Sequence, residues 1–406
     1  MDVELADAYE FFNLIMGEAG IDSPHPELVA LRRLSPIVEK FPDGRFGVPS
    51  KTASGTATRI LHALSHEAVT RVLKDAETFS SRIFPPNLWM VMGKSLFYMD
   101  EPEHGKYRAV LRTFFSPQRI EEWEQRCIRP LVHRLIDRFA AKGRADLLRD
   151  FTSRLPVHVI AHIIGYPARD VPKIQRWALE LLSVTRDLGT GMAGSEALSQ
   201  YLRGLLAERR AHPRDDLLSY LVQAELEGRP LEEHEILSFL LFLTPSGFET
   251  TFRALTNLLF GLLTQPEQLQ ALRANPSLLP QAVEEGLRWE ANDIRMMRVC
   301  VRDTEVCGVF IPAGTIVHAS LASANRDEAV FENAASFDIF RPQRPHLTFS
   351  AGAHFCLGAR LSRLELSASV EGLLERLPNL RLDPLWDDPY VHGSIFRGPR
   401  RLPVLF

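Results

Sequence analysis

One cysteine stands in a sequence context suited to holding a metal-bound group. Residues 349–358 read FSAGAHFCLG, so glycines bracket Cys356, and a helix-forming run follows from Ala359 to Glu371. A sulfur in this position lies at a helix N-terminus, where the peptide dipoles favour an anion. A thiolate held there could be an axial ligand to haem iron, and thiolate ligation favours cleavage of the O–O bond.

Other roles of Cys356 have to be weighed against that of a haem ligand. A lone cysteine is most often a small buried hydrophobe. A zinc site fits poorly, because His354 and Cys356 lie too close together and the sequence has no second Cys-x-x-Cys pair. A nucleophilic cysteine needs a separate histidine and an orienting group, which the sequence does not place. Three further motifs decide between these roles.

A second motif lies inside a long apolar run, residues 231–264, which predicts a helix buried on most sides. Residues 246–251 read SGFETT, and an acid and an alcohol in mid-helix are unfavourable in an apolar core unless they are paired. One alternative is structural: the threonine bonds back to its own helix and the glutamate faces solvent. Pro245 lacks a backbone donor, so we expect it to kink or open the helix and to free a carbonyl near Leu241.

Two pairs of polar residues have helical spacing. Glu285 and Arg288 are three residues apart on one helix face, where an exposed pair contributes roughly a few tenths of a kcal/mol. Many helices contain this pair by chance, so its meaning depends on its neighbours. His104 and Arg108 are one helical turn apart, and a solvated amphipathic helix would explain them equally well.

Taken in order, these motifs resemble those of the cytochrome P450 family. The loop around Cys356 matches the family's haem-binding pattern F-x-x-G-x-H-x-C-x-G. The acid–threonine pair, the E-x-x-R pair and residues 337–342 (FDIFRP) precede it in the family's order. The resemblance covers the chain from about residue 100 to the C-terminus. It implies that haem b (iron protoporphyrin IX) is the cofactor and that Cys356 binds its iron.

The resemblance also implies roles for the other motif residues. Glu249 and Thr250 would relay protons to bound dioxygen, and Gly247 would leave room for the dioxygen because it has no side chain. A charged network that stabilises the haem loop would consist of Glu285, Arg288 and Arg341. The haem propionates are anions, which charge-assisted donors would hold. These donors would be His104, Arg108, Arg298 and His354.

Three residues depart from the family's pattern. Ser350 stands where the family usually has Gly, and we expect it to fit if its φ is negative. Ser246 stands where Ala is usual. Ala291 stands where Pro is usual, so the segment 292–297 could run differently over the haem.

Helical signals dominate the rest of the chain. We expect helices over residues 65–74, 119–141, 170–185, 196–211, 231–264, 280–289 and 359–377, with another beginning near 214–218. The glycine-rich residues 189–194 should separate two of these helices. Strands are expected at residues 45–48, 304–310, 316–318 and 402–406. We therefore predict a mainly α protein with small β-sheets, folded as a single triangular cytochrome P450-like domain over residues 1–406.

Bulk properties exclude several classes of protein. The chain has 406 residues and a net charge of −4, which argues against a general nucleic-acid binder. Its four cysteines are too few for a disulfide scaffold and suit a reducing, cytoplasmic location. The first basic residue is Arg32, so a secretory signal is not expected. Glu249 and Arg253 interrupt the most apolar stretch, so we expect no membrane anchor.

The resemblance places the substrate pocket in variable segments above the haem. Their mostly apolar composition predicts a hydrophobic substrate of moderate size. The candidate lining residues are Phe84, Leu88, Trp89, Leu182, Leu243, Gly247, Ile294, Met297, Ile395 and Phe396. Asp293 and Arg295 are charged exceptions, which could anchor a polar substrate end; we favour the simpler interpretation that they pair at the surface.

No flavin or iron–sulfur motif is present, so the resemblance implies that a reductase and a ferredoxin or flavodoxin supply electrons. Basic residues on the protein surface nearest the thiolate would suit docking of an acidic partner, although ordinary solvated surface charges would give the same pattern. These residues are Arg112, Arg344, Arg360 and Arg363.

The chain is therefore expected to be a haem-thiolate monooxygenase that uses O2. Two alternatives stay open: a peroxygenase driven by hydrogen peroxide, and a non-catalytic haem protein that senses a ligand.

Overall fold

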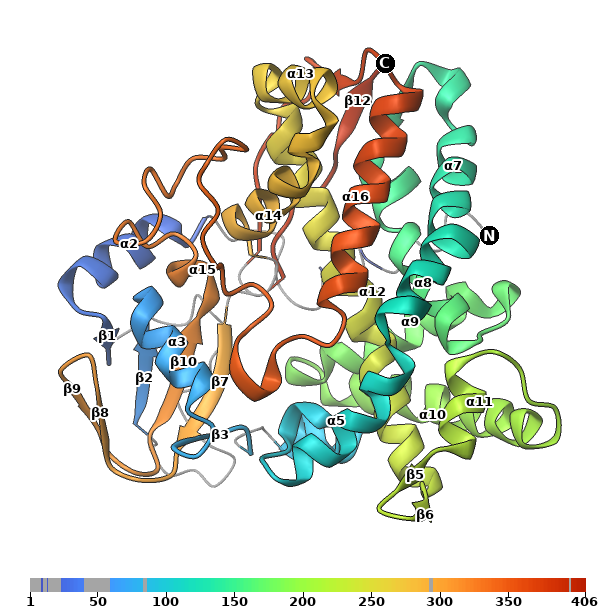
Figure 1. Ribbon diagram of the computed structural model, residues 1–406, viewed down its shortest axis with the longest axis vertical. Helices are drawn as coiled ribbons and strands as arrows, with labels where there is room; N and C mark the ends of the chain where they lie inside the picture. The colour runs from blue at the N-terminus through green and yellow to red at the C-terminus, as the bar shows by residue number, and fades with distance from the viewer. Residues whose placement is uncertain are drawn as a thin grey trace.

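A long helix, α12 (Glu233–Leu263), runs through the middle of the protein (Figure 1). The computed structural model describes Tyr9, Asn13 and residues 23–39, 59–82, 86–291, 295–393 and 396–406. Helix α12 begins at a capping box, in which the Glu235 carboxylate accepts the backbone N–H of Glu232 at 2.7 Å. Most of its side chains are buried. The sequence-based prediction of a long buried helix over residues 231–264 is confirmed.

Other helices pack around α12, among them α8, α10, α14 and α16. The helices are α2 (His25–Leu34), α3 (His66–Lys74), α4 (Pro86–Met92), α5 (Glu103–Phe114), α6 (Pro117–Trp123), α7 (Arg129–Asp137), α8 (Leu155–Ile164), α9 (Val171–Leu182), α10 (Leu188–Ala211), α11 (Leu217–Gln223), α13 (Pro266–Ala274), α14 (Leu279–Trp289), α15 (Leu321–Ala324) and α16 (Ala359–Arg376). No helix in the described part of the chain has both the length and the apolar character that a bilayer crossing requires.

The largest sheet lies to one side of the helices, beside α2, α3 and α15 (Figure 1). Its strand order is β1 (Ile37–Val38), β2 (Ile60–Ala63), β10 (Ile316–Ser320), β7 (Arg295–Cys300) and β3 (Phe79–Ser80). Strands β2 and β10 are parallel and the other neighbours are antiparallel. The mainly α architecture with small sheets agrees with the sequence-based prediction, whereas the expected strand at 45–48 lies outside the described residues.

Three smaller sheets complete the described β structure. One has the order β11 (Arg381–Leu382), β12 (Pro403–Leu405) and β4 (Arg144–Asp146), and two are hairpins. The hairpins pair β5 (Glu225–Leu226) with β6 (Arg229–Pro230), and β8 (Thr304–Val306) with β9 (Val309–Ile311).

The single strand expected over residues 304–310 is wrong, because β8 and β9 form a hairpin there. Its turn residues Cys307 and Gly308 have φ values of 50° and 78°. Positive φ at both central residues is typical of the two-residue turns that match the twist of a hairpin. The sequence signal is weak because Cys is an unusual residue for the first of these positions.

The expected break at residues 189–194 is also wrong, since these residues form the first turns of α10. Asp187 caps the helix by accepting the backbone N–H of Thr190 at 3.1 Å. A Cβ atom on Gly194 would lie 2.6 Å from the carbonyl oxygen of Trp177 in α9. Gly194 is therefore needed for close packing of α9 against α10, and the glycine-rich residues do not end a helix.

The helix expected over residues 119–141 is divided into α6, a π-helical turn (Glu124–Ile128) and α7, which ends at Asp137. Pro130 explains the division. It has no backbone N–H to donate to the carbonyl of Arg126, so the regular ladder cannot continue through this point.

Two glycines of α10 provide a matched test of this packing. We expect Gly194→Ala to lower the free energy of unfolding by about 1–3 kcal/mol, because its methyl group would collide with the backbone of α9. Gly204 has open space where a Cβ would stand, so Gly204→Ala should leave stability unchanged or raise it by up to about 1 kcal/mol. Denaturant unfolding of both variants is the measurement, and equal effects would contradict the packing argument.

Candidate functional site

The loop before α16 presents Cys356 at the start of that helix. The backbone N–H of Cys356 donates to the carbonyl of Phe349 at 2.9 Å, which closes the loop on itself. Gly352 has a φ of 71°, and a Cβ there would lie 2.7 Å from the carbonyl oxygen of Leu73 in α3. This glycine is required by both its conformation and its contact. The loop thus holds the cysteine in the position that the sequence predicts.

The surroundings of the Cys356 thiol affect its pKa in opposite directions. Its side chain is exposed on one side. The packed loop on its other sides desolvates the sulfur and raises its pKa above the ordinary value. The backbone N–H groups of Gly358 and Ala359 and the guanidinium of Arg108 lower the pKa and offset part of this rise. These donors would stabilise a thiolate ligand once a metal replaces the proton.

The condition under which Ser350 was expected to fit the loop, a negative φ, is not met. Its φ is 61°, in the left-handed region that glycine adopts without steric cost. Its backbone N–H donates to the carbonyl of Leu347 at 2.8 Å, so the loop imposes the conformation. The buried hydroxyl of Ser350 has no hydrogen-bond partner in the described part of the chain. Serine therefore occupies a glycine-type position with no compensating bond.

The four predicted propionate donors come together beside this loop. The rings of His104 and His354 lie 4.0 Å apart between centroids. Arg108, one turn beyond His104 on α5, donates to the carbonyl of Phe355, next to Cys356. The side chain of Arg298 on β7 is 3% exposed and donates to the carbonyl of Met297 at 2.7 Å. The alternative of a solvated amphipathic helix is wrong for His104, which is buried.

This cluster has too few negative partners for its positive groups. Burial, and then the charges of Arg298, His104 and Arg108, lower the pKa of His354 to about 3. Burial lowers the pKa of Arg298 to about 10, and Asp100 opposes this change. Neither Arg108 nor Arg298 forms an ion pair within the described residues. Two haem propionates would supply the missing negative charge, so these residues fit the cofactor.

Helix α12 carries a half-open stripe in an otherwise buried stretch. Leu243, Ser246, Gly247 and Thr250 are only half-buried, whereas the residues between them are almost all buried. Their spacing of three or four residues places them on one side of the helix. A helix in the protein interior can leave one side accessible only where it borders a cavity. The stripe contains the predicted oxygen-binding motif.

The acid–threonine pair is held by its own helix. Glu249 is 1% exposed, and its Oε1 accepts the Arg253 Nε–H at 2.9 Å. The alternative of a solvent-facing glutamate is therefore wrong. The Thr250 hydroxyl donates to the Ser246 carbonyl at 3.0 Å, which is the back-bonding that the sequence left open. Helix α12 runs through Pro245 without interruption, so this proline does not break the helix, and the expected kink stays a prediction.

Gly247 has a packing partner that the sequence did not indicate. A Cβ atom at this position would lie 2.6 Å from Cγ1 of Ile160 in α8. The expectation that the missing side chain leaves empty space is wrong on this side of the helix. The glycine allows α8 and α12 to approach closely.

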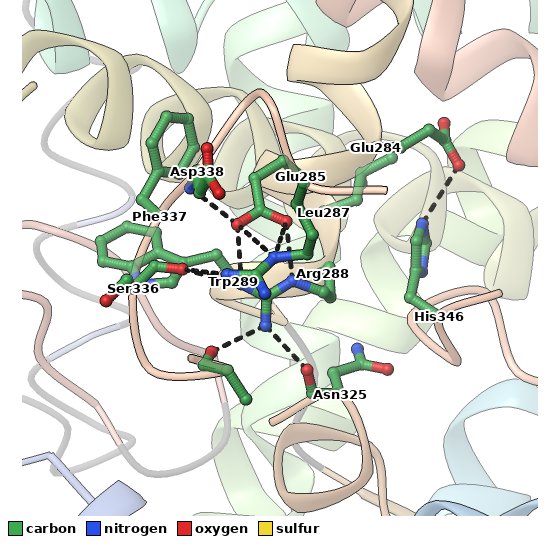
Figure 2. A network of polar contacts seen from close by, with 12 residues as sticks. Glu284, Glu285, Leu287, Arg288, Trp289, Asn325, Ser336, Phe337, Asp338 and His346 are labelled. Carbon is green, nitrogen blue, oxygen red and sulfur yellow. Dashed lines mark hydrogen bonds and ion pairs between the residues drawn. The ribbon is translucent and has the colours of Figure 1, made fainter. Parts of the chain in front are cut away.

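The network expected from the E-x-x-R motif is present and buried (Figure 2). Arg288 binds both carboxylate oxygens of Glu285, at 2.7 Å each, in a forked geometry. Arg341 Nε lies 3.3 Å from the same oxygens. Both guanidinium groups also donate to the backbone carbonyl of Ser336 at 3.0 Å. The three side chains thereby fix the segment that precedes the haem loop.

Asn325 extends this network to the haem loop. Arg288 donates to its carbonyl at 2.9 Å. The Asn325 side chain accepts the backbone N–H of Leu347 at 2.7 Å and donates to the hydroxyl of Thr348 at 2.8 Å. The loop containing Cys356 begins with the next residue. A short chain of hydrogen bonds therefore connects α14 to the loop.

A second buried network of charged side chains was not predicted from the sequence. Glu290, one residue after α14, accepts hydrogen bonds from Arg397 at 2.6 Å and Arg326 at 2.9 Å. His25 lies 3.0 Å from the same carboxylate. The three basic groups hold the pKa of Glu290 well below its usual range, although burial opposes them. Nothing in the sequence indicates that Arg326 and Arg397 share one carboxylate.

The predicted pocket residues are distributed over several elements. Leu182 ends α9, Met297 lies in β7, and Phe396 lies near the C-terminus; all three are half-buried. Trp89 in α4 is 48% exposed. Leu88 belongs to α4, but its side chain is outside the description. Phe84, Ile294 and Ile395 lie outside the described residues, as does Asp293, so its pairing with Arg295 stays a prediction.

The sequence of this chain is similar to those of known proteins. A model of the cytochrome P450 family matches residues 184–381. Mycinamicin IV hydroxylase/epoxidase from Micromonospora griseorubida is 38% identical over 322 residues, which are 78% of this chain and 81% of that protein. The putative cytochrome P450 YjiB of Bacillus subtilis (strain 168) is 36% identical over 324 residues, again 78% of this chain and 81% of its own length.

Solved structures share the whole architecture. The crystal structure of P450BioI in complex with hexadec-9Z-enoic acid ligated acyl carrier protein has a TM-score of 0.84 and 32% sequence identity. The match covers 95% of this chain and 98% of that one.

The strained serine leads to a prediction about stability. We expect Ser350→Gly to raise the free energy of unfolding by about 1 kcal/mol, because glycine adopts a positive φ without the clash of a Cβ. Ser350→Ala removes the unpaired hydroxyl but keeps the Cβ, so it separates the two contributions. Thermal unfolding of the three proteins is the measurement. A gain in the alanine variant as large as that in the glycine variant would assign the effect to the hydroxyl.

The buried network leads to a second prediction. Glu285→Gln should lower the free energy of unfolding by about 3–5 kcal/mol, because it leaves two buried guanidinium groups without a carboxylate. Glu121 pairs with Arg360 at 2.5 Å on the surface, so Glu121→Gln should change stability by less than about 1 kcal/mol. Denaturant unfolding compares the two. Similar losses would show that the buried network has no special role.

Proposed function

The chain belongs to the cytochrome P450 family, whose cofactor is haem b and whose members are monooxygenases, and on this premise we propose its specific reaction. The protein inserts one atom of O2 into a hydrophobic small molecule, with electrons from a ferredoxin or flavodoxin and its reductase. The observation that carries the proposal is the position of Cys356, exposed at the start of α16 beside a cluster of basic side chains, of which His104 and Arg298 are buried. Haem, when bound, supplies the activation of dioxygen.

The protein's own residues bind and orient this group. Cys356 Sγ is the iron ligand, and the N–H groups at the start of α16 stabilise its negative charge. His104, Arg108, Arg298 and His354 hold the propionates. The network around Glu285 positions the start of the loop through Asn325. The network around Glu290 joins the end of α14 to Arg326 and Arg397.

Thr250 and Glu249 serve the transfer of protons. The Thr250 hydroxyl donates its hydrogen to the Ser246 carbonyl, so the lone pairs of Thr250 Oγ1 remain as acceptors. Thr250 lies in the half-open stripe of α12, where this oxygen can accept a hydrogen bond from a water molecule. Glu249 is buried and pairs with Arg253. A carboxylate therefore belongs to the residue directly before Thr250.

The substrate is apolar in this proposal because the described lining candidates, among them Leu182, Leu243 and Met297, are apolar. The relatives do not point to one compound. One is named for mycinamicin IV, and a structural neighbour was solved with an acyl carrier protein bearing hexadec-9Z-enoic acid.

The proposed electron donor docks on the side of the thiolate. Arg360 and Arg363 already pair with Glu121 and Glu284, at 2.5 and 2.6 Å. Arg112 and Arg344 are exposed, and neither forms an ion pair among the residues that the structure describes. They are the better candidates for an acidic partner. The four cysteines are all free, which supports a reducing compartment such as the cytoplasm.

The proposal is tested with purified protein loaded with haem. The reduced carbon monoxide complex should show the red-shifted absorption band of sulfur ligation, and Cys356→Ser should lose it. Oxidation of an apolar substrate should depend on NAD(P)H, reductase and ferredoxin. Turnover with peroxide alone would support the peroxygenase alternative, and ligand binding without any turnover would support a sensor.

Thr250 offers a sharper test of proton transfer. In Thr250→Ala, we expect the yield of product per O2 consumed to fall about 10-fold or more, because a proton-handling hydroxyl is lost. Thr264→Ala is the control, since Thr264 also bonds back to α12, at 2.9 Å from the Phe260 carbonyl, but at the far end of the helix. Unchanged yield in Thr250→Ala, or the same fall in both variants, would contradict this role.

A further inference from the structure

The start of the chain contacts α12 at the level of the acid–threonine pair. The ring of Tyr9 lies 4.3 Å from that of Phe252 and 6.4 Å from that of Phe248, measured between centroids. Each of the three side chains is at most 2% exposed. Because Phe248 and Phe252 are one helical turn apart, they lie next to each other on the surface of α12. Tyr9 therefore anchors the start of the chain to the turn of α12 that contains Glu249.

Asn13 binds the partner of Glu249. Its side-chain Oδ1 accepts a hydrogen bond from Arg253 Nη2–H at 2.6 Å. Arg253 also donates its Nε–H to Glu249 Oε1 at 2.9 Å. The side chains of this ion pair are only 4% and 1% exposed, and hydrogen bonds to charged groups are among the strong ones. One guanidinium thus joins the start of the chain to the carboxylate of the acid–threonine pair.

Tyr9 lies close to the same ion pair. The Arg253 guanidinium is 5.1 Å from the centroid of the Phe252 ring, on which Tyr9 packs. Burial, and then the charge of Glu249, raise the pKa of the Tyr9 phenol well above its ordinary value, whereas Arg253 lowers it. The phenol therefore stays neutral. A buried neutral ring beside the pair helps to exclude water, and charges interact more strongly where water is excluded.

The pairing of Arg253 differs from that in the network below the haem loop. Arg288 uses Nε and Nη2 to bind both oxygens of Glu285 in a fork. Arg253 donates Nε–H to a single oxygen of Glu249, and its Nη2 donates to Asn13 instead. The guanidinium is thus shared between two acceptors. The second oxygen of Glu249 is left to contacts other than a fork with Arg253.

The orientation of Glu249 has to be fixed by its partners. Thr250 follows it by one residue, which is about 100° of rotation around the helix. The carboxylate therefore lies at the flank of the half-open stripe and not within it. A glutamate side chain has several rotatable bonds and much rotamer freedom to lose. Its approach to the Thr250 hydroxyl depends on how Arg253 holds it.

We propose that Asn13 is a positioning residue for proton transfer: it holds Arg253 so that this residue binds only one oxygen of Glu249. The carboxylate takes up a proton from water and releases it toward Thr250, and its negative charge is restored at the end of each transfer. A fork with Arg253 would engage both oxygens and oppose this exchange. The inference rests on the proposed function, because it concerns how the same acid and threonine deliver protons.

The test uses the haem-loaded protein with a reductase and a ferredoxin, and dodecanoic acid as the probe substrate. In Asn13→Ala, we expect the product formed per O2 consumed to fall about 3-fold or more, because a misplaced proton-handling group slows its step. The ratio of turnover rates in H2O and D2O should rise, which a purely structural role would not cause. Asn13→Asp keeps an oxygen for Arg253, so it should retain about half or more of the wild-type yield.

Two comparisons show whether Asn13 acts through Glu249. In the Glu249→Gln protein, Asn13→Ala should cause no further fall in yield, because the group that it positions is already lost. Asn275→Ala is the matched control, since the Asn275 side chain also accepts a hydrogen bond, from the Ser277 hydroxyl at 2.6 Å, but at an exposed position outside α12. Unchanged yield and isotope ratio in Asn13→Ala, an equal fall in Asn275→Ala, or a further fall in the Glu249→Gln protein would overturn the inference.

Crystal structures of the wild-type protein and of Asn13→Ala give a readout that does not depend on turnover. In the variant, Arg253 should bind both oxygens of Glu249, and an unchanged pair would contradict the role of Asn13. Absence of the sulfur-ligation band, or of any NAD(P)H-dependent oxidation, in the wild-type protein would overturn the proposed function instead. The two failures are therefore distinguishable.

Discussion

The buried interaction of Glu285 with two arginines holds the site together. Two segments that are far apart in the sequence meet at one carboxylate: helix α14 and the stretch from Ser336 to Arg341. A charge inside a protein is strongly unfavourable unless its partners and hydrogen bonds are complete. Here the carboxylate binds two guanidinium groups, which in turn saturate backbone carbonyls. Few other arrangements would satisfy these buried charges, so the network fixes where the following loop begins. Asn325 extends the network to the loop by accepting the backbone N–H of Leu347.

The cofactor region shows the opposite electrostatic situation. Around Glu285 and Glu290, positive and negative groups are combined within the protein. Around His104, Arg108, Arg298 and His354, positive groups are gathered with few carboxylates to pair with them. The fold therefore retains a cluster that is favourable only with an anion bound. Cofactor binding and stability of this region are coupled for that reason, since a ligand that binds only the folded state stabilises it.

Helix α12 combines two requirements that conflict. As the central helix it needs close contacts, which Gly247 provides by admitting Ile160 of α8. As the wall of the site it needs an accessible stripe, which Leu243, Ser246 and Thr250 provide. Thr250 of the stripe donates to the Ser246 carbonyl, and its buried neighbour Glu249 pairs with Arg253 of the same helix. The helix can thus carry an acid and an alcohol through the core without large cost.

The local motifs were readable from the sequence because each depends on residues close together in the chain. The cysteine loop, the Glu285–Arg288 pair and the long helix around Thr250 are of this kind, and so is the mainly α character of the fold. Ser350 marks the limit, since its identity suggested a negative φ, while the bond between its N–H and Leu347 and the packing of the loop hold it at 61°.

Contacts between distant segments were decided by the tertiary structure. Gly194 lies inside α10 because α9 packs closely against it, and Glu290 binds partners from both ends of the chain. His62 and His318 meet only because β2 and β10 pair in one particular register. A sequence specifies which side chains are available and their local conformational preferences. Which of them share a buried environment depends on the packing of the whole chain, because burial and charge pairing are properties of the space between elements.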